Sequence, residues 1–399
     1  MFENIIGQEK TISALQHDVD SQTLPGSLLI HGEPYSGKLT TALEIARVLS
    51  CGGDRSWSCR CRACDLHRVL SHPGMLLLGS RAFGAELAAA ADVLRRLQNV
   101  PSRYLYVRAA RKLLRRCDPR VWEGTEPRMR QALAAAAEIE ESLADLEPGA
   151  SLPPPEELQA LLERIGEKAR QVASALPRDN TPISVIRKAA FWARLSTTEP
   201  ARVLIFENAD RMVEASRNSL LKLLEEPPGG LHIILLSTNV QAMLPTILSR
   251  VRRYRLEPRN EATAREVLSR VFRVESGGFP SLAAYFLSWD KVTGDETGLL
   301  AELFLGTAGS AELDERALYA MYDKCQRQSE LDGGAFFREF SRSLAERMRA
   351  RWLDGTDNRD RVDRWNRILQ DAASEQARLN LQPMLVVQAT LYRMRDAAA

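Results

Sequence analysis

A glycine-rich segment, Gly32 to Lys38, limits what this chain can fold into more than any other stretch. It reads G-E-P-Y-S-G-K and fits the phosphate-binding pattern G-x-x-x-x-G-K. An apolar run, Ser27–His31, precedes it, and an amphipathic stretch, Lys38–Leu49, follows it. This pattern requires a buried strand, a tight loop, and a helix whose first amides face an anion. The segment therefore predicts a P-loop in which Gly32, Gly37 and Lys38 contact phosphate.

The position after Lys38 departs from this pattern in a way that bears on catalysis. A serine or threonine is expected there, because its hydroxyl binds Mg²⁺, but this chain has Leu39. Thr40 and Thr41 lie further round the helix and should point away from the metal. Thr40 is retained as a candidate nucleotide contact.

Hydrolysis also needs acidic groups at the end of a second strand, to hold Mg²⁺ and to activate water. The candidate strand Val203–Phe206 is followed by Glu207 and Asn208. Glu207 can approach a metal, whereas Asn208 cannot act as a base. Asp210 is expected to cap the next helix. We therefore predict that the chain does not hydrolyse ATP, while binding of ATP or ADP stays open.

Apolar runs that alternate with helical stretches indicate the fold class. Val203–Phe206 and Ile233–Leu236 suit buried parallel strands, and Ser216–Glu226 between them has helical spacing. This alternation predicts an α/β domain with a parallel sheet and flanking helices, and the remainder of the chain reads as helical. In chain order we expect a P-loop domain, a small helical domain and an all-α domain over residues 1–258, 259–295 and 296–399.

A stretch of different composition, about residues 84–178, interrupts the expected sheet domain. It is rich in alanine, leucine, arginine and glutamate and predicts a helical insertion. Its first half is basic, from Arg95 to Arg116, and its second half is acidic, from Glu138 to Glu147. Opposite charges most simply indicate neighbouring helices that attract one another. A patch for the DNA backbone is the alternative.

Four of the six cysteines fall within one short stretch and predict a metal site. They are spaced C-x7-C-x-C-x2-C and comprise Cys51, Cys59, Cys61 and Cys64. Four thiolates in one loop suit a closed tetrahedral zinc site of the structural kind. Because the C-x-C step is tight, His67 and His72 are alternative ligands nearby. Cys117 and Cys325 stand alone in helix-like stretches and are expected to be packing thiols.

Composition and charge restrict the class of partner. The 54 basic and 52 acidic residues leave a formal charge of +2, so binding to nucleic acid would depend on local patches. No apolar run reaches the roughly 18 residues that span a bilayer. The first residues lack the basic-then-apolar layout of a signal peptide. We expect a cytoplasmic protein with no membrane partner.

An arginine near the end of the expected sheet domain is a candidate for catalysis in a neighbouring subunit. Ser249 and Arg250 follow the run Leu244–Leu248. An arginine at the edge of a P-loop domain can be presented to the γ-phosphate bound by an adjacent subunit. The pattern alone has low specificity, because a surface arginine is usually only solvated.

Several stretches coincide, in order, with those of one family. They are Gly7-Gln8, the P-loop, the cysteine stretch, Ser71-His72-Pro73, the run N-S-L-L-K-L-L-E-E-P-P over 218–228, Ser237-Thr238-Asn239 and Ile247 to Arg250. Together they resemble bacterial DNA polymerase III clamp-loader subunits of the gamma/tau and delta prime type. The resemblance covers about 1–82 and 181–258, and Asn380–Leu385 resembles the last helix of the family's collar domain. It implies that the three expected domains are an AAA+ domain, a lid and a collar, and it offers no counterpart for residues 84–178.

Within that family the residues favour delta prime. Gamma-type subunits carry Gly-Lys-Thr and an Asp-Glu pair where this chain has Leu39 and Asn208. The lid segment 277–282 lacks the sensing arginine of the motor subunits, whereas Arg250 is kept. The resemblance implies a subunit that assembles with gamma/tau and delta in a hetero-pentamer of the polymerase III holoenzyme. It would supply Arg250 to a neighbour's ATP and help load the sliding clamp on primed DNA.

Two other functions stay open. One is a gamma/tau-type subunit that binds and turns over ATP itself. The other is a zinc-containing scaffold that binds nucleic acid through the basic half of the insertion.

Overall fold

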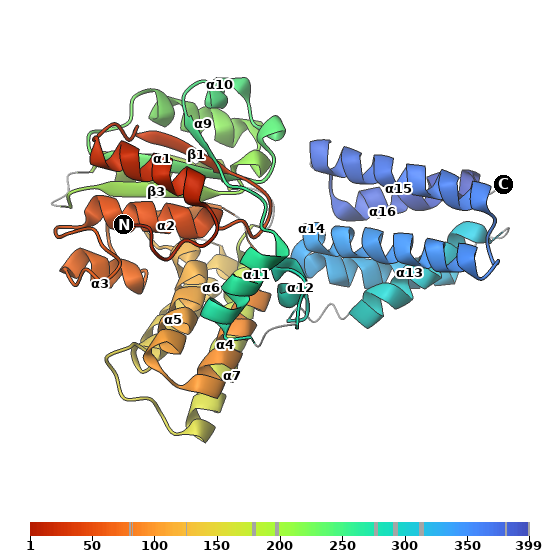
Figure 1. Cartoon of the computed structure of the whole chain (residues 1–399), viewed down its shortest axis with the longest axis horizontal. Helices are drawn as coiled ribbons and strands as arrows, with labels where there is room; N and C mark the ends of the chain where they lie inside the picture. The colour runs from red at the N-terminus through yellow and green to blue at the C-terminus, as the bar shows by residue number, and fades with distance from the viewer. Residues whose placement is uncertain are drawn as a thin grey trace. The chain divides into compact units, whose positions relative to one another are not determined.

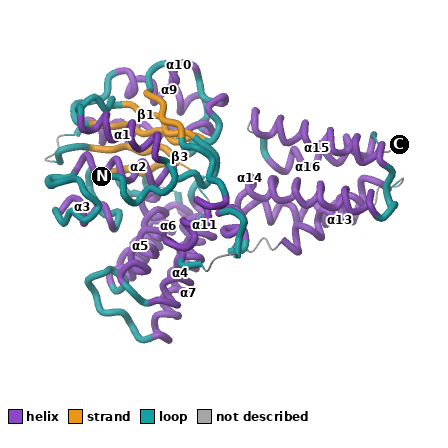
Figure 2. Tube along the Cα trace, viewed as in Figure 1, coloured by secondary structure: helices purple, strands orange, loops and turns teal. Residues whose placement is uncertain are grey.

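The computed structural model describes residues 1–79, 81, 83–124, 126–177, 181–195, 199–274, 278–289, 294–310, 315–379 and 381–397. The chain divides into two units, Met1–Phe286 and Leu287–Ala399 (Figures 1 and 2). The first unit contains the sheet and the second is helical, as the sequence predicted.

The first unit is built on a parallel sheet. Its strands are β1 (Ser27–His31), β2 (Met75–Gly79), β3 (Arg202–Glu207), β4 (Leu231–Ser237) and β5 (Arg252–Arg255). Their order across the sheet is β2-β3-β4-β1-β5, and every neighbouring pair is parallel. The expected α/β class is therefore confirmed. The three strands expected from the sequence correspond to β1, β3 and β4, whereas β2 and β5 were missed.

Side chains that alternate along the strands form two apolar layers, because successive residues of a strand face opposite sides of the sheet. Val203 and Ile205 pack with α1 (Glu9–Asp20) and α2 (Lys38–Ser50) on one face. Leu204 and Phe206 pack on the other face with α8, α9 and α10. These three helices span Ile183–Arg194, Glu214–Glu225 and Pro245–Leu248. Both faces of the sheet are thus covered, as parallel sheets require.

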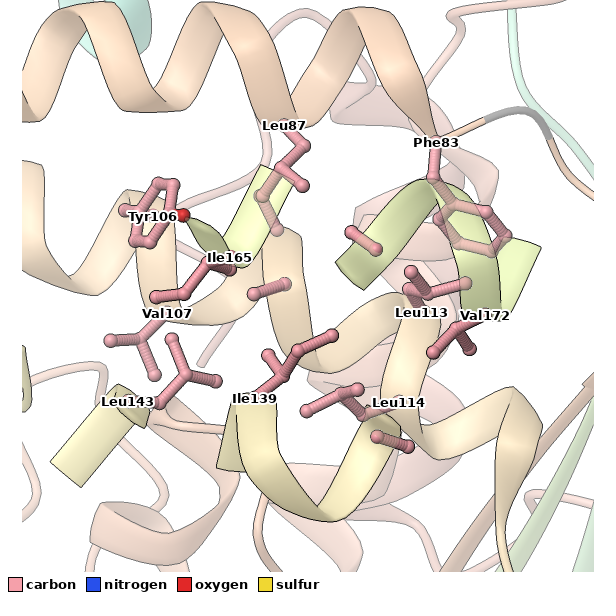
Figure 3. Close-up of a cluster of buried hydrophobic side chains, with 14 of the residues drawn as sticks. Phe83, Leu87, Tyr106, Val107, Leu113, Leu114, Ile139, Leu143, Ile165 and Val172 are labelled. Carbon is pink, nitrogen blue, oxygen red and sulfur yellow. The ribbon is translucent and has the colours of Figure 1, made fainter. Parts of the chain in front are cut away.

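The insertion is helical, as predicted, and has a core of its own. Its helices are α4 (Gly84–Leu97), α5 (Val100–Leu114), α6 (Pro127–Ala144) and α7 (Pro155–Ala175). Figure 3 shows their apolar side chains converging, with Tyr106 of α5, Ile139 of α6 and Ile165 of α7 among them. This core explains how a long insertion stays ordered beside the sheet.

The basic half of the insertion is used inside the molecule. Arg108 and Arg111 of α5, and Arg115 directly after this helix, donate to backbone carbonyls of residues 67–70. These carbonyls lie at the C-terminal end of α3 (Arg62–Arg68), where a helix attracts cations. The arginines therefore fasten the insertion to the segment that carries the cysteines.

The acidic half of the insertion meets the basic half directly. Arg111 pairs with Glu140 at 2.8 Å and with Glu147 at 2.5 Å. Arg103 donates to the carbonyls of Leu146 and Ala150 beyond α6. This arrangement agrees with the expectation of mutually attractive helices. It leaves these arginines engaged within the chain and not available to a DNA backbone.

The remaining elements are helical. In the first unit they are α11 (Glu261–Val267), which continues into a π turn over Leu268–Phe272, and α12 (Leu282–Leu287). Short 3₁₀ turns occur at Arg115–Cys117, Ala209–Arg211 and Val240–Ala242. The second unit consists of α13 (Gly294–Gly309), α14 (Glu315–Leu353), α15 (Arg359–Leu379) and α16 (Pro383–Asp396). Its core includes Trp365, whose indole donates to the Met394 carbonyl at 2.8 Å.

The structure also bears on the isolated residues and on membranes. Cys117 and Cys325 are buried in the cores of the insertion and of the second unit, as expected for packing thiols. No helix among the described residues has the length and apolarity to cross a bilayer.

Replacing Arg111 by alanine tests how the insertion is attached. Arg111 is buried and its loss leaves two carboxylates and the Val69 carbonyl without their donor. We expect the free energy of unfolding to fall by about 3 kcal/mol. Arg95→Ala, which removes an exposed arginine of α4, should change it by less than about 0.5 kcal/mol. Urea unfolding of the two variants makes the comparison, and equal stabilities would contradict the proposed attachment.

Candidate nucleotide site and metal centre

The P-loop adopts the geometry that its glycines permit. At Gly32 an added Cβ would lie 2.6 Å from the Leu256 carbonyl oxygen, so a side chain does not fit there. Gly37 has φ 103° and is the residue before α2. Lys38 donates through Nζ to the carbonyls of Gly32, at 2.8 Å, and Glu33, at 2.6 Å. The Lys38 side chain is therefore held by two carbonyl oxygens of the loop itself.

The loop is also held from its outer side by residues that the sequence analysis did not connect with it. Arg259 donates to the carbonyls of Tyr35, at 3.0 Å, and Ser36, at 3.3 Å. Gln8 donates to the same Ser36 carbonyl and exchanges two hydrogen bonds with the Glu257 backbone. Such contacts fix the loop before any ligand binds.

A buried hydroxyl inside the loop lacks an acceptor or donor. Ser36 Oγ has no hydrogen-bond partner in the described structure, and the residue is only 1% exposed. The Cβ that any residue other than glycine would have at position 32 would lie 3.1 Å from this oxygen. Buried polar groups are almost always satisfied, and a phosphate oxygen bound by the loop is a group that would satisfy this hydroxyl. The residues present thus suit the phosphates of a nucleotide.

The position after Lys38, where a hydroxyl would bind magnesium, is filled by a buried apolar side chain. Leu39 is 5% exposed and packs in the layer between α2 and the sheet. Thr41, two residues on, donates to the Gly37 carbonyl at 3.1 Å, and Thr40 is half-buried. Neither observation places a threonine hydroxyl at the position that Leu39 occupies.

Glu207, at the end of β3, is engaged by two arginines. Arg81 donates to its Oε1 at 2.9 Å, and Arg116 donates to its Oε2. Burial disfavours the ionised carboxylate, but the charges of Arg81 and Arg116 outweigh burial and hold the Glu207 pKa below its usual value. Both oxygens of the expected metal ligand are therefore taken by guanidinium groups, which the sequence did not predict.

The end of β2 approaches Glu207 closely. Gly79 pairs with Glu207 in the sheet register, and a Cβ at Gly79 would lie 2.1 Å from the Glu207 carbonyl oxygen. A glycine is required for that approach. Arg81 follows closely and also pairs with Glu86 at 2.7 Å.

A second carboxylate completes the charged network. Glu86 of α4 pairs with Lys112 of α5 as well as with Arg81. Burial opposes ionisation of Glu86, but these cations lower its pKa to about 2. Burial, together with the charge of Arg81, lowers the pKa of Lys38 to about 8, against the opposing charges of Glu207 and Asp210. Arg81 therefore lies within electrostatic reach of the P-loop lysine.

The structure places Asp210 and Asn208, two residues after β3 that the sequence analysis considered. Asp210 does not cap α9: its carboxylate accepts from the Thr238 amide at 3.3 Å, and the residue before α9 is Val213. That expectation was wrong because a 3₁₀ turn separates Asp210 from the helix. Asn208 adopts a left-handed conformation with φ 54° directly after β3.

Arg250 lies apart from the P-loop lysine network, just after α10. Its Nη2 pairs with Glu225 Oε1 at 2.7 Å, and its Nη1 donates to the Thr246 carbonyl and to Ser249 Oγ. The side chains of Arg250 and Glu225 are 35% and 45% exposed. The guanidinium is thus held at the surface by a pair that water can screen.

The four cysteines predicted from their spacing come together. The ligand atoms of Cys51, Cys59, Cys61 and Cys64 all lie within 4.8 Å of one another. The Cys51 sulfur lies 3.6 Å from that of Cys59 and 3.9 Å from that of Cys61. Tetrahedral zinc, with Zn–S bonds near 2.3 Å, separates its sulfur ligands by about 3.8 Å. The donor set and the spacing therefore fit a zinc ion.

Neither histidine belongs to this cysteine group. The His67 and His72 rings stack on each other, with centroids 4.2 Å apart. His72 also lies 3.3 Å from Glu199. The metal-competent group among the described residues comprises cysteines only.

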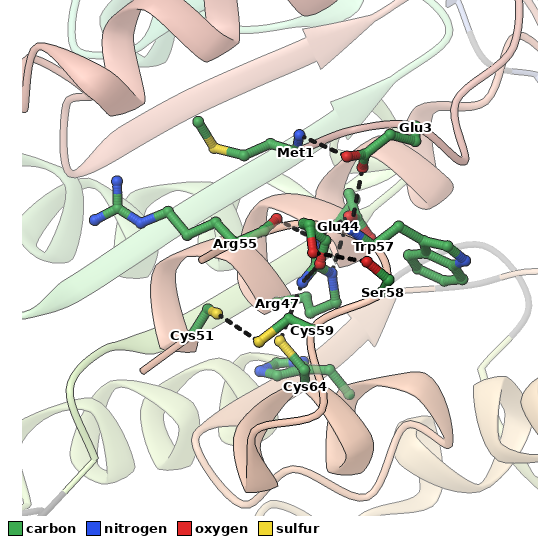
Figure 4. A network of polar contacts seen from close by, with 12 residues as sticks. Met1, Glu3, Glu44, Arg47, Cys51, Arg55, Trp57, Ser58, Cys59 and Cys64 are labelled. Carbon is green, nitrogen blue, oxygen red and sulfur yellow. Dashed lines mark hydrogen bonds and ion pairs between the residues drawn. The ribbon is translucent and has the colours of Figure 1, made fainter. Parts of the chain in front are cut away.

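A buried arginine supports the cysteine group from α2. Arg47 donates to Cys64 Sγ at 3.0 Å and pairs with Glu44 at 2.6 Å (Figure 4). It also donates to backbone carbonyls of the cysteine loop and lies against the Trp57 ring. Hydrogen bonds to a thiolate favour its ionised form, so Arg47 suits a metal-bound sulfur.

Comparisons with known proteins relate part of the chain to replication proteins. Residues 175–260 match the family described as DNA polymerase III, delta subunit. The DNA polymerase III subunits gamma/tau of Mycobacterium bovis and Mycobacterium tuberculosis are each 30% identical over 246 residues, which is 54% of this chain and 42% of theirs. The chain therefore spans less than half the length of these curated relatives.

A solved structure was also matched. It is a DNA polymerase III gamma subunit-related protein from Thermotoga maritima, with 20% identity, a TM-score of 0.28, and coverage of 59% of this chain and 90% of that chain. The sequence matches show that part of this chain is similar to DNA polymerase III subunits of the gamma/tau and delta kinds. They do not separate delta prime from gamma/tau.

Zinc content tests the cysteine centre. We expect the purified chain to hold a stoichiometric amount of zinc and Cys64→Ser to lose most of it, because a structural site needs all four ligands. Cys117→Ala, which removes a buried thiol outside the group, should retain the metal. Elemental analysis after gel filtration measures the zinc content of the wild type and of both variants. A wild-type chain whose melting temperature is the same with and without zinc would contradict the assignment.

Proposed function

We propose that this chain is a delta-prime-type subunit of a bacterial DNA polymerase III clamp loader. The observation that carries the proposal is the pairing of Glu207 with Arg81 and Arg116. A motor subunit needs that carboxylate free to organise magnesium. A subunit that only braces the assembly does not.

The rest of the site agrees with a subunit that lacks hydrolysis of its own. Leu39 is packed in the core, and Asn208 stands where an acid would activate water. Without a metal ligand and a base, a bound triphosphate would not be cleaved at a useful rate. The similarity to gamma/tau subunits in sequence supports membership of the same assembly.

Arg250 would act on a neighbouring subunit. Its surface pair with Glu225 contributes little stability, since exposed ion pairs are worth about 0–1 kcal/mol. A γ-phosphate presented by an adjacent gamma/tau subunit carries more charge and would attract Arg250 away from Glu225. Arg250 would then stabilise the negative charge of the transition state, with Ser249 beside it.

The other features predicted from the sequence would contribute to this role as follows. Residues 1–258 would be the AAA+ domain, 259–295 the lid and 296–399 the collar that assembles with gamma/tau and delta. Zinc would stabilise the cysteine loop structurally. The assembly would open the sliding clamp and load it on primed DNA in the cytoplasm.

A gamma/tau-type subunit is the second candidate, because the curated relatives carry that name. It predicts ATP turnover by the chain alone. A nucleic-acid-binding scaffold finds less support, since Arg103, Arg108 and Arg111 are engaged within the chain. It predicts salt-sensitive DNA binding by the chain alone.

The test of the proposal is Arg250→Ala in a complex reconstituted with gamma/tau and delta. We expect the DNA-stimulated ATPase rate to fall by at least about tenfold, because an arginine finger contributes on the order of a thousandfold at the site it serves. Arg253→Ala, which removes an exposed arginine of β5, is the matched control. The readout is phosphate release.

Gel filtration must show that both variants still enter the complex. A normal ATPase rate with Arg250→Ala would remove the role in trans. Failure of the wild-type chain to join the complex would reject the clamp-loader proposal as a whole, and ATP turnover by the isolated chain would favour the gamma/tau type.

A further inference from the structure

Magnesium does not fit the candidate nucleotide site, although the phosphate cradle does. Leu39 offers no oxygen, and both oxygens of Glu207 accept from guanidinium groups. A cation at Glu207 would have to displace two arginines and approach their positive charge. The disagreement between a well-formed cradle and a closed metal position requires its own explanation.

The two guanidiniums are held in place by the fold. Arg116 is 2% exposed, donates to the Lys112 carbonyl, and lies 4.9 Å from the Phe83 ring centroid. Arg116 lies just after α5, and two arginines of α5, Arg108 and Arg111, fasten this helix to the end of α3. Arg81 is held by its ion pairs with Glu207 and Glu86.

The charges at the end of β3 do not cancel. Among the described residues, Arg81 pairs with both Glu86 and Glu207, Lys112 pairs with Glu86, and Arg116 pairs with Glu207, so three cations share two carboxylates. Positive charge therefore exceeds negative charge within this set of ion pairs, whereas Asp210 and Glu33 add negative charge beside Lys38. In P-loop proteins the excess positive charge at this place is supplied by the metal ion.

Arg81 is the member of the pair able to reach a ligand. Its side chain is 26% exposed, whereas that of Arg116 is 2% exposed. Its contacts with Glu207 and Glu86 use two hydrogen-bonded pairs, and a guanidinium carries five N–H donors. The Arg81 charge also acts on Lys38. Arg81 therefore has N–H donors beyond those that its two carboxylate contacts use.

The second observation that points to a ligand is the buried Ser36 hydroxyl. It has no partner in the described structure and lies inside the cradle beside Gly32. The cradle is fixed from outside by Arg259 and Gln8, so its shape does not require a bound metal. A phosphate oxygen would satisfy Ser36 Oγ and release Lys38 from the loop carbonyls.

We propose that the P-loop binds the phosphates of a nucleoside di- or triphosphate without magnesium, with Arg81 in the electrostatic place of the metal. Arg116, supplied by the insertion, holds Glu207 so that this carboxylate neither binds a metal nor repels the phosphates. The insertion thus contributes one of the two guanidiniums that occupy the Glu207 carboxylate. This inference rests on the same Glu207 contacts as the proposed function, but its test measures nucleotide binding by the chain itself and not its assembly with other subunits.

The test is equilibrium binding of fluorescent ADP and ATP analogues to the full chain. Buffer is stripped of divalent cations with a chelating resin and given back zinc only, so that the cysteine centre stays loaded. We expect the dissociation constant to change by less than about twofold when magnesium is added. Binding that requires magnesium, or no binding in either buffer, would overturn the proposal.

Variants locate the interaction. Arg81→Gln should weaken binding by about tenfold in both buffers, because it removes a charge-assisted hydrogen bond. Arg81→Lys keeps the charge and should retain most of the affinity. Arg95→Ala, an exposed arginine of α4, should match the wild type. Equal affinities for wild type and Arg81→Gln would contradict the assigned role of Arg81.

The change in nucleotide affinity caused by Glu207→Gln distinguishes a metal-independent site from a metal-dependent one. If Arg81 replaces the metal, loss of the carboxylate should leave binding unchanged or tighter. If Glu207 serves a metal, the same change should weaken binding in magnesium. Circular dichroism checks that each variant is folded, and pull-down with gamma/tau and delta is scored separately, so a failure of nucleotide binding is distinguished from a failure to join the clamp loader.

Discussion

The double contact of Glu207 with Arg81 and Arg116 is the interaction on which the rest of the site depends. A buried carboxylate needs compensation for lost hydration, and two guanidiniums supply it here. Because they do, the end of β3 is stable without a metal ion. Leu39 can then point into the core without leaving an unsatisfied site, and the loss of the magnesium hydroxyl has no structural cost.

The position of Arg116 depends in turn on the insertion and on the cysteine loop. Arginines of α5 bind the carbonyls at the end of α3, and α3 carries Cys64. Arg47 of α2 donates to the sulfur of that cysteine, and α2 begins at the P-loop. A continuous set of contacts therefore joins the zinc-competent group, the insertion and the nucleotide cradle. Each depends on the others for its geometry, although the sequence presents them as three separate motifs.

The sequence predicted what local patterns determine. The P-loop, β1, α2 and the cysteine group follow from spacing alone, and the structure has all of them. β5 was missed because it consists of three arginines and one tyrosine, of which only Tyr254 is buried. The partners of Glu207 were beyond reach, since Arg116 and Arg81 lie 91 and 126 residues away along the chain. No pattern in one sequence pairs charges at such separations, and the role of residues 84–178 stayed unassigned for the same reason.

A crystal structure of the chain with ADP and Mn²⁺ is the most direct measurement of whether guanidinium groups replace the metal. Manganese is located by its anomalous scattering and takes the oxygen ligands that magnesium takes. We predict nucleotide phosphates in the loop from Gly32 to Lys38, Arg81 and Arg116 still on Glu207, and no manganese at that carboxylate. A manganese ion bound to Glu207, with either arginine displaced, would contradict it.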